Sequence, residues 1–197
     1  MARTLNRHAA QGNAKAAQPP PMFFVTDPQR TPDPLAVAER LPRGAGVIYR
    51  AFGAADALDI ALGLRRLAER RGLILLIGAD AALAARCGAH GVHLPERDLH
   101  RGPRLSARWP DWLITGAAHS ARALAAAGSA GLDAALVSPV FPSNSPSARG
   151  VLSPVRFARL AAQSRLPVYA LGGVSAATAP RLIGTGAAGL AAVEGLC

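Results

Sequence analysis

Residues 73–94, LILLIGADAALAARCGAHGVHL, decide the fold because they hold a complete strand–helix–strand unit. The continuous apolar run Leu73–Ile77 is typical of a strand that is buried on both faces of a parallel sheet. The Ala-rich segment Asp80–Cys87 predicts a helix that ends at Gly88, and Gly91–Leu94 forms a second apolar run. Strands joined by helices in this way are the repeating unit of α/β folds.

The same alternation extends in both directions along the chain. Helices are expected over Ala55–Arg71, Ser120–Ala127 and 153–163, with a further helix beginning at Ser175. Apolar runs predict eight strands: Met22–Thr26, Gly46–Arg50, Leu73–Ile77, Gly91–Leu94, Trp112–Thr115, Ala134–Ser138, Val168–Leu171 and Gly189–Val193. This pattern favours a single (β/α)8 TIM barrel over residues 22–197, with a doubly wound open sheet as the alternative. The barrel is short, and we expect its last helix to be missing or vestigial.

Composition narrows the class of protein. Half of the residues are hydrophobic and only 5% are aromatic, so Ala, Leu, Val and Ile must build the core. Residues 1–21 are expected to form a basic disordered tail without a signal peptide, and no apolar run is long enough to cross a membrane. The only cysteines, Cys87 and Cys197, show no metal-binding spacing, which favours a soluble cytoplasmic protein.

Charge and lysine usage exclude two function classes. The net charge is +10, but no nucleic-acid motif or basic stripe with interleaved aromatics is present, so no nucleic-acid partner is expected. The only lysine is Lys15, within the tail. A Schiff-base mechanism inside the barrel is therefore excluded.

Reactive groups of such barrels lie at the carboxyl ends of the strands. Gly172 and Gly173 follow the seventh strand, where barrels commonly bind phosphate, so their backbone amides are expected to hold a phosphate together with the next helix N-terminus. Gly189 is expected to belong to the same phosphate site. His119, after the fifth strand, is either a general acid/base or a capping or surface histidine.

Three further residues have two interpretations each. Arg50 could clamp an anionic group, or it could form a rim ion pair with Asp27. Asp27 is itself a candidate substrate-binding, metal-binding or proton-transfer carboxylate. Asp98 is either a metal ligand or an exposed loop residue. His93 lies within an apolar strand, where a hydrogen-bonded structural role is favoured.

Several segments share the order and spacing of one set of motifs. They are 23–27 FFVTD, 91–99 GVHLPERDL, 138–143 SPVFPS, 167–174 PVYALGGV and 186–193 GAAGLAAV. This set resembles the thiamine-phosphate synthase and thiazole tautomerase superfamily, whose sixth strand usually ends in Gly-Pro-Val-Phe-Pro-Thr. The resemblance covers Met22 to Leu196 and implies the same (β/α)8 barrel.

The resemblance also implies an activity. The synthase joins a pyrimidine methyl-pyrophosphate to a hydroxyethylthiazole phosphate and releases pyrophosphate with Mg²⁺. It implies that Gly172 and Gly173 hold the thiazole phosphate, that Asp98 binds Mg²⁺ and that Arg50 contacts the pyrophosphate. The sixth-strand motif adds Ser138, Ser143 and Arg149 as substrate-binding residues.

The departures from the family pattern leave three functions open. The Asn-Asp pair that ends the third strand falls on Gly78-Ala79, the lysine after the sixth strand on Pro146, and a serine near the last loop on Glu194. A thiamine-phosphate synthase would use Mg²⁺, whereas a thiazole tautomerase would use His119 and no cofactor. The third possibility is a catalytically degenerate barrel that binds a phosphorylated thiazole. A homodimer could cover the flank without a last helix.

Overall fold

The structure, a computed structural model, describes residues 19–143 and 150–194 of the 197-residue chain. Eight parallel strands close into a barrel in which each strand pairs with the next and the last pairs with the first. The predicted (β/α)8 barrel is therefore confirmed. The strands are β1 (Met22–Val25), β2 (Gly46–Tyr49), β3 (Ile74–Gly78), β4 (Gly91–Leu94), β5 (Leu113–Ala118), β6 (Ala134–Val137), β7 (Val168–Ala170) and β8 (Gly189–Ala192).

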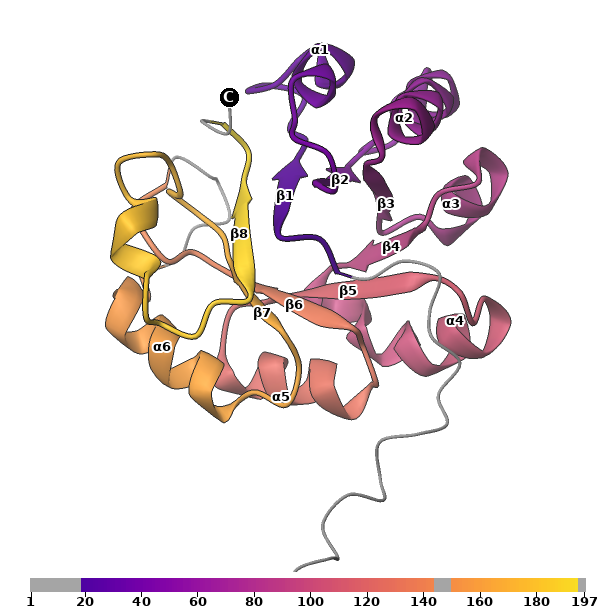
Figure 1. Ribbon diagram of the computed structural model, residues 1–197. Helices are drawn as coiled ribbons and strands as arrows, with labels where there is room; N and C mark the ends of the chain where they lie inside the picture. Colours follow the sequence, from indigo (N-terminus) through magenta and orange to yellow (C-terminus); the bar gives the residue numbers. More distant parts are fainter. Residues whose placement is uncertain (1–18, 144–149, 195–197) are drawn as a thin grey trace, which may run out of the picture.

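Helices surround the strands, as Figure 1 shows. Local sequence signals fix several of their ends: the side chains of Asp33, Asp80 and Ser120 accept amide hydrogen bonds at helix N-termini. Gly72 and Gly88 end two helices in the left-handed conformation. The helices are α1 (Pro34–Glu39), α2 (Ala57–Arg71), α3 (Ala81–Cys87), α4 (Gly102–Arg108), α5 (Ala121–Ser129) and α6 (Ser153–Gln163), with the 3₁₀ helices η1 (Glu96–Arg101) and η2 (Ala179–Leu182).

The segment between β7 and β8 corrects one expectation. The helix predicted to begin at Ser175 is not formed, and only η2 lies there. Instead, the Thr178 hydroxyl oxygen accepts a hydrogen bond from the Ser175 amide and donates one to the carbonyl of Gly173. Pro180 lacks an amide hydrogen, so it could not continue a helix from Ser175. Within the described ranges no helix follows β8.

Two apolar clusters hold the barrel together. One fills the space between strands and helices, and the other lies inside the barrel. Inside, the Phe23 and Tyr169 rings meet edge to face with centroids 5.1 Å apart. Gly189 leaves room for this pair, because a Cβ there would lie 2.5 Å from the Tyr169 ring.

The chain before β1 closes the amino-terminal end of the barrel. The buried Tyr169 hydroxyl donates to the carbonyl of Pro20 at 2.7 Å, and the Leu190 amide donates to Pro21 at 3.3 Å. Pro20 and Pro21, just before the boundary expected at Met22, are thus hydrogen-bonded to β7 and β8. The remainder of the predicted tail, residues 1–18, lies outside the described residues. No helix in the described ranges is long and apolar enough to span a membrane.

Candidate functional site

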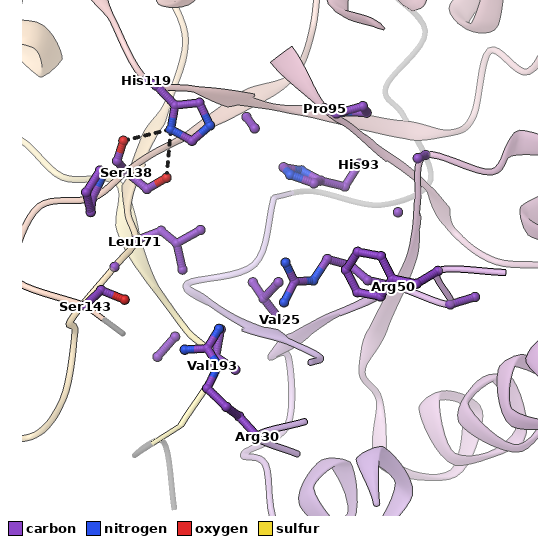
Figure 2. A pocket seen from close by; sticks show the side chains of 18 of the residues that line it. Val25, Arg30, Arg50, His93, Pro95, His119, Ser138, Ser143, Leu171 and Val193 are labelled. Atoms are coloured by element: carbon purple, nitrogen blue, oxygen red, sulfur yellow. Dashed lines mark hydrogen bonds between the residues drawn. The ribbon is translucent and has the colours of Figure 1, made fainter. Parts of the chain in front are cut away.

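A cavity of about 1020 Å³ opens where the carboxyl ends of the strands meet. It lies at the end of the barrel where reactive groups of this fold are found. Figure 2 shows around it the side chains of Val25 on β1 and His93 on β4. It also shows Arg50, His119, Ser138 and Leu171, which directly follow β2, β5, β6 and β7. Its polar and charged lining residues are Arg30, Arg50, Asp80, His93, Arg97, Arg101, His119, Ser138, Ser143, Ser175 and Glu194.

The loop after β7 presents two backbone amides to this cavity. Gly172 and Gly173 adopt φ values of 90° and 65°, which glycine tolerates best. The carbonyls of Leu171 and Gly172 accept hydrogen bonds from Val140 and Phe141, each at 3.0 Å, and so fix the loop against the chain after β6. Within the described ranges, the amides of Gly172 and Gly173 donate to no protein group. They are open donors suited to an anion.

The loop is also packed too closely for any larger residue. A Cβ at Gly172 would lie 2.8 Å from Pro139, and one at Gly173 would lie 2.3 Å from the Pro142 carbonyl oxygen. Because no α-helix follows, any attraction for an anion comes from the amides themselves and not from a helix dipole.

His119 lies at the carboxyl end of β5 with one ring nitrogen fixed. Its Nδ1 is 2.9 Å from the Ser138 carbonyl oxygen and 3.2 Å from the Ser138 hydroxyl oxygen. A carbonyl can only accept, so Nδ1 carries the hydrogen and Nε2 holds the lone pair of the neutral ring. The His119 amide donates to Glu96 at 2.8 Å, which holds the backbone as well. Figure 2 shows Nε2 on the side of the ring away from Ser138.

Two arginines share one carboxylate beside β1. Asp27 Oδ2 lies 3.2 Å from a guanidinium nitrogen of Arg30 and 3.2 Å from one of Arg50. Burial opposes ionisation of Asp27, but hydrogen bonds from Arg30 and from the Gln29 amide outweigh it and lower the pKa of the carboxyl. Arg50 also donates from Nε to the Thr26 carbonyl at 2.6 Å. Of the two interpretations of Arg50, the ion pair with Asp27 is observed.

His93 faces the cavity from β4 but is buried. Its Nδ1 lies 2.9 Å from the hydroxyl of Thr115 in β5, which is the hydrogen bond expected of a structural histidine. Burial, followed by repulsion from Arg50 and His119, lowers the pKa of His93 to about 4. The imidazole is therefore neutral at physiological pH and lines the cavity as a neutral group.

The residues expected to bind Mg²⁺ do not fit a metal site. Asp98 does not line the cavity, and its carboxylate lies 4.0 Å from both Arg97 and Arg101. Asp80 accepts the Leu83 amide at 2.8 Å as the cap of α3. Within the described ranges, no three His, Cys, Asp or Glu side chains are placed to hold a metal ion. A magnesium ion needs several oxygen ligands in octahedral geometry, which these carboxylates do not offer.

Only some of the other predicted site residues line the cavity. Ser138 and Ser143 line the cavity, whereas Asp27 does not and instead holds the two arginines. Gly189 is a correction: it opens β8 at the amino end of the barrel, packed against Pro21 and Tyr169, and so cannot reach an anion at the carboxyl end. Arg149 lies outside the described residues.

Sequence reasoning missed several residues of the cavity wall. Arg30 comes from the loop after β1, and Arg97 and Arg101 come from η1. Phe52, on the loop after β2, is 68% exposed and lies under the Arg50 guanidinium at 5.2 Å. The signal for Arg30 was its position three residues after Asp27, close behind a strand end.

Comparison with known proteins gives a consistent result. The family model described as thiamine monophosphate synthase matches residues 22–196. A putative thiamine-phosphate synthase of Geobacter sulfurreducens is 35% identical, covering 89% of this chain and 85% of the relative. A thiamine-phosphate synthase of Geobacillus kaustophilus is 28% identical, with coverages of 89% and 83%.

A solved structure agrees in fold. Thiamine phosphate pyrophosphorylase from Pyrococcus furiosus superposes with a TM-score of 0.74 at 22% identity, covering 86% of this chain and 83% of that one. The family match over nearly the whole barrel, together with the glycine loop after β7, confirms the resemblance. The chain belongs to the thiamine monophosphate synthase family.

Proposed function

We propose that this protein acts in thiamine biosynthesis by binding a hydroxyethylthiazole phosphate and coupling it to a pyrimidine methyl-pyrophosphate. The observation that carries the proposal is the pair of open amides at Gly172 and Gly173 within a cavity large enough for two heterocycles. Backbone donors of this kind bind a phosphate without a compensating charge. The named relatives support the coupling reaction.

In this proposal the cavity organises the two reactants. The phosphate of the thiazole lies on the glycine amides, which leaves the ring inside the cavity wall formed by Ser138 and His119. A new bond forms between the thiazole nitrogen and the pyrimidine methylene carbon while the bond from that carbon to pyrophosphate breaks. Holding both reactants in one site lowers the entropic barrier to the step.

The test is a coupling assay with both substrates, run with and without Mg²⁺, that measures thiamine phosphate and pyrophosphate. Equal amounts of both products would support the proposal. Binding of the thiazole phosphate should be measured in parallel by calorimetry. Absence of product in the presence of Mg²⁺, with both substrates above saturation and the protein folded, would reject the synthase activity.

The fixed tautomer of His119 supports a second candidate, isomerisation of a carboxythiazole phosphate. Nε2 carries the lone pair, so it can remove a proton from the ring and return it at another position. In His119→Gln this activity should fall by at least 100-fold while phosphate binding is retained. Undiminished isomerisation by His119→Gln would remove the histidine from the mechanism. A cytoplasmic location and a homodimer stay predictions.

A further inference from the structure

The cavity of this chain carries positive charge where its family is expected to hold a metal ion. Four arginines and two carboxylates, Asp80 and Glu194, are among its lining residues. Asp98, the expected magnesium ligand, lies between two of these arginines and outside the cavity wall. Asp27 and Asp98 pair with these arginines from outside the wall, so the wall offers a ligand guanidinium N–H donors that suit an anion, and not the carboxylate oxygens that a dication needs.

We infer that this site binds a diphosphate group through arginine side chains, without a metal ion as intermediary. The inference deepens the proposed function and relies on it for the identity of the ligand, the pyrophosphate end of the second substrate. Guanidinium groups suit this role because their fork of N–H donors matches phosphate oxygens in pairs.

Arg30 and Arg50 form the fixed part of the site. Their side chains are 22% and 29% exposed, so both are partly shielded from solvent. Asp27 and the Thr26 carbonyl hold Arg50, and the Phe52 ring lies 5.2 Å below its guanidinium. A prearranged guanidinium loses little side-chain entropy when an anion binds.

The free donor groups of this pair suit an anion. Two guanidiniums share the carboxylate of Asp27, and Arg30 also lies 3.9 Å from the exposed carboxylate of Glu194. Each guanidinium has five N–H donors, so both keep donors beyond these ion pairs. Burial lowers the pKa of Arg50, the Asp27 carboxylate opposes this, and repulsion from Arg30 acts in the same direction as burial. A bound diphosphate would relieve both effects, because it replaces lost water with charge-assisted hydrogen bonds.

Arg97 and Arg101 extend the positive surface from η1. Both line the cavity, and their side chains are 80% and 43% exposed. Their greater exposure leaves them room to change rotamer around a ligand, whereas hydrogen bonds to Asp27 hold Arg30 and Arg50. Asp98 lies beside this second pair as Asp27 lies beside the first, since its carboxylate is 4.0 Å from Arg97 and 4.0 Å from Arg101.

The test is calorimetric titration of the full chain with inorganic pyrophosphate in buffer containing EDTA, repeated with Mg²⁺. We expect saturable binding in EDTA that Mg²⁺ does not strengthen. Arg30→Gln should weaken it about tenfold, which corresponds to one charge-assisted hydrogen bond. Arg122→Gln, an exposed arginine on α5, is the matched control and should bind as the parent does.

Two results would overturn the inference: binding that appears only with Mg²⁺, or equal binding by Arg30→Gln and Arg122→Gln. Arg97→Gln serves as a second variant should Arg30→Gln fail to fold. The proposed function fails separately. Metal-free pyrophosphate binding without any coupling would reject the synthase activity but support the inference. Coupling by a protein that binds pyrophosphate only with Mg²⁺ would support the synthase activity and overturn the inference.

Discussion

Replacing Gly173 by Ala tests the phosphate loop most directly, because the chain offers a matched control. Gly173 and Gly131 both have φ of 65°, but a Cβ at Gly131 meets nothing within 4 Å. Gly131→Ala therefore measures the cost of the left-handed backbone alone, about 1 kcal/mol. Any further loss in Gly173→Ala comes from its surroundings.

The surroundings of Gly173 make that loss substantial. A Cβ there would lie 2.3 Å from the Pro142 carbonyl oxygen, about 1 Å short of the ~3.3 Å at which carbon and oxygen normally meet. The opposing atoms are backbone and the Phe141 Cβ, so none of them can rotate away. Overpacking of this kind costs about 1–3 kcal/mol, which gives a total of about 2–4 kcal/mol for Gly173→Ala.

The loop shift should also remove anion binding. Moving an amide by about 1 Å takes it out of hydrogen-bonding range, so inorganic phosphate should bind Gly173→Ala at least tenfold more weakly. Urea unfolding followed by circular dichroism measures stability, and calorimetry measures phosphate binding. Equal stability losses in the two variants, or parent-like phosphate binding by Gly173→Ala, would refute this account of the loop.

Three more predictions follow from charge and burial. Unfolded His93 takes up a proton near pH 6.5, but the folded protein does not until about pH 4, so stability should fall by about 3 kcal/mol as pH drops through that window. Urea unfolding at pH 7 and pH 5 should show about 2 kcal/mol of this fall in the parent and none of it in His93→Gln, since pH 5 still lies above the folded pKa; an equal change of unfolding free energy in both proteins would contradict it. Glu194→Gln should bind inorganic phosphate about threefold more tightly at low salt, because a nearby negative charge is removed. An unchanged affinity in calorimetry would place the carboxylate away from the anion. Tyr169→Phe should lose about 1–2 kcal/mol because it leaves the Pro20 carbonyl unpaired, and an unchanged unfolding midpoint would argue against that bond.

The strands could be predicted because a buried parallel strand is a short, continuous apolar run, and such runs recur at near-regular spacing along this chain. Each expected strand is present, and Gly91–Leu94 has its predicted ends. The glycine loop and His119 followed from strand ends alone. The prediction for Gly189 was wrong because this glycine begins the last strand and so lies at the opposite end of the barrel from the strand-end loops.

The arginine pair could not be predicted because it depends on the path of a loop. Residues 26–31 turn back on themselves: the Thr31 amide donates to the Asp27 carbonyl, and the Asp27 amide donates to the Thr31 hydroxyl oxygen. Only this turn brings Arg30 beside Arg50, which is twenty positions away in sequence. The helix expected at Ser175 was wrong for another reason, which the sequence itself contains: Pro180 lacks the amide hydrogen that a helix interior needs.

The side chains that line the cavity differ in whether they can give or take a proton. In the part of the chain that the structure describes, every cationic side chain lining the cavity is a guanidinium, which keeps its proton at any physiological pH. His93 is neutral and its Nδ1 is bonded to Thr115. Among the remaining acids and bases that line the cavity, Asp80 caps α3 and Glu194 lies 3.9 Å from Arg30. Among the described lining residues, His119 is thus the group that we propose exchanges a proton with a ligand, while the arginines are proposed to bind the charge of the ligand.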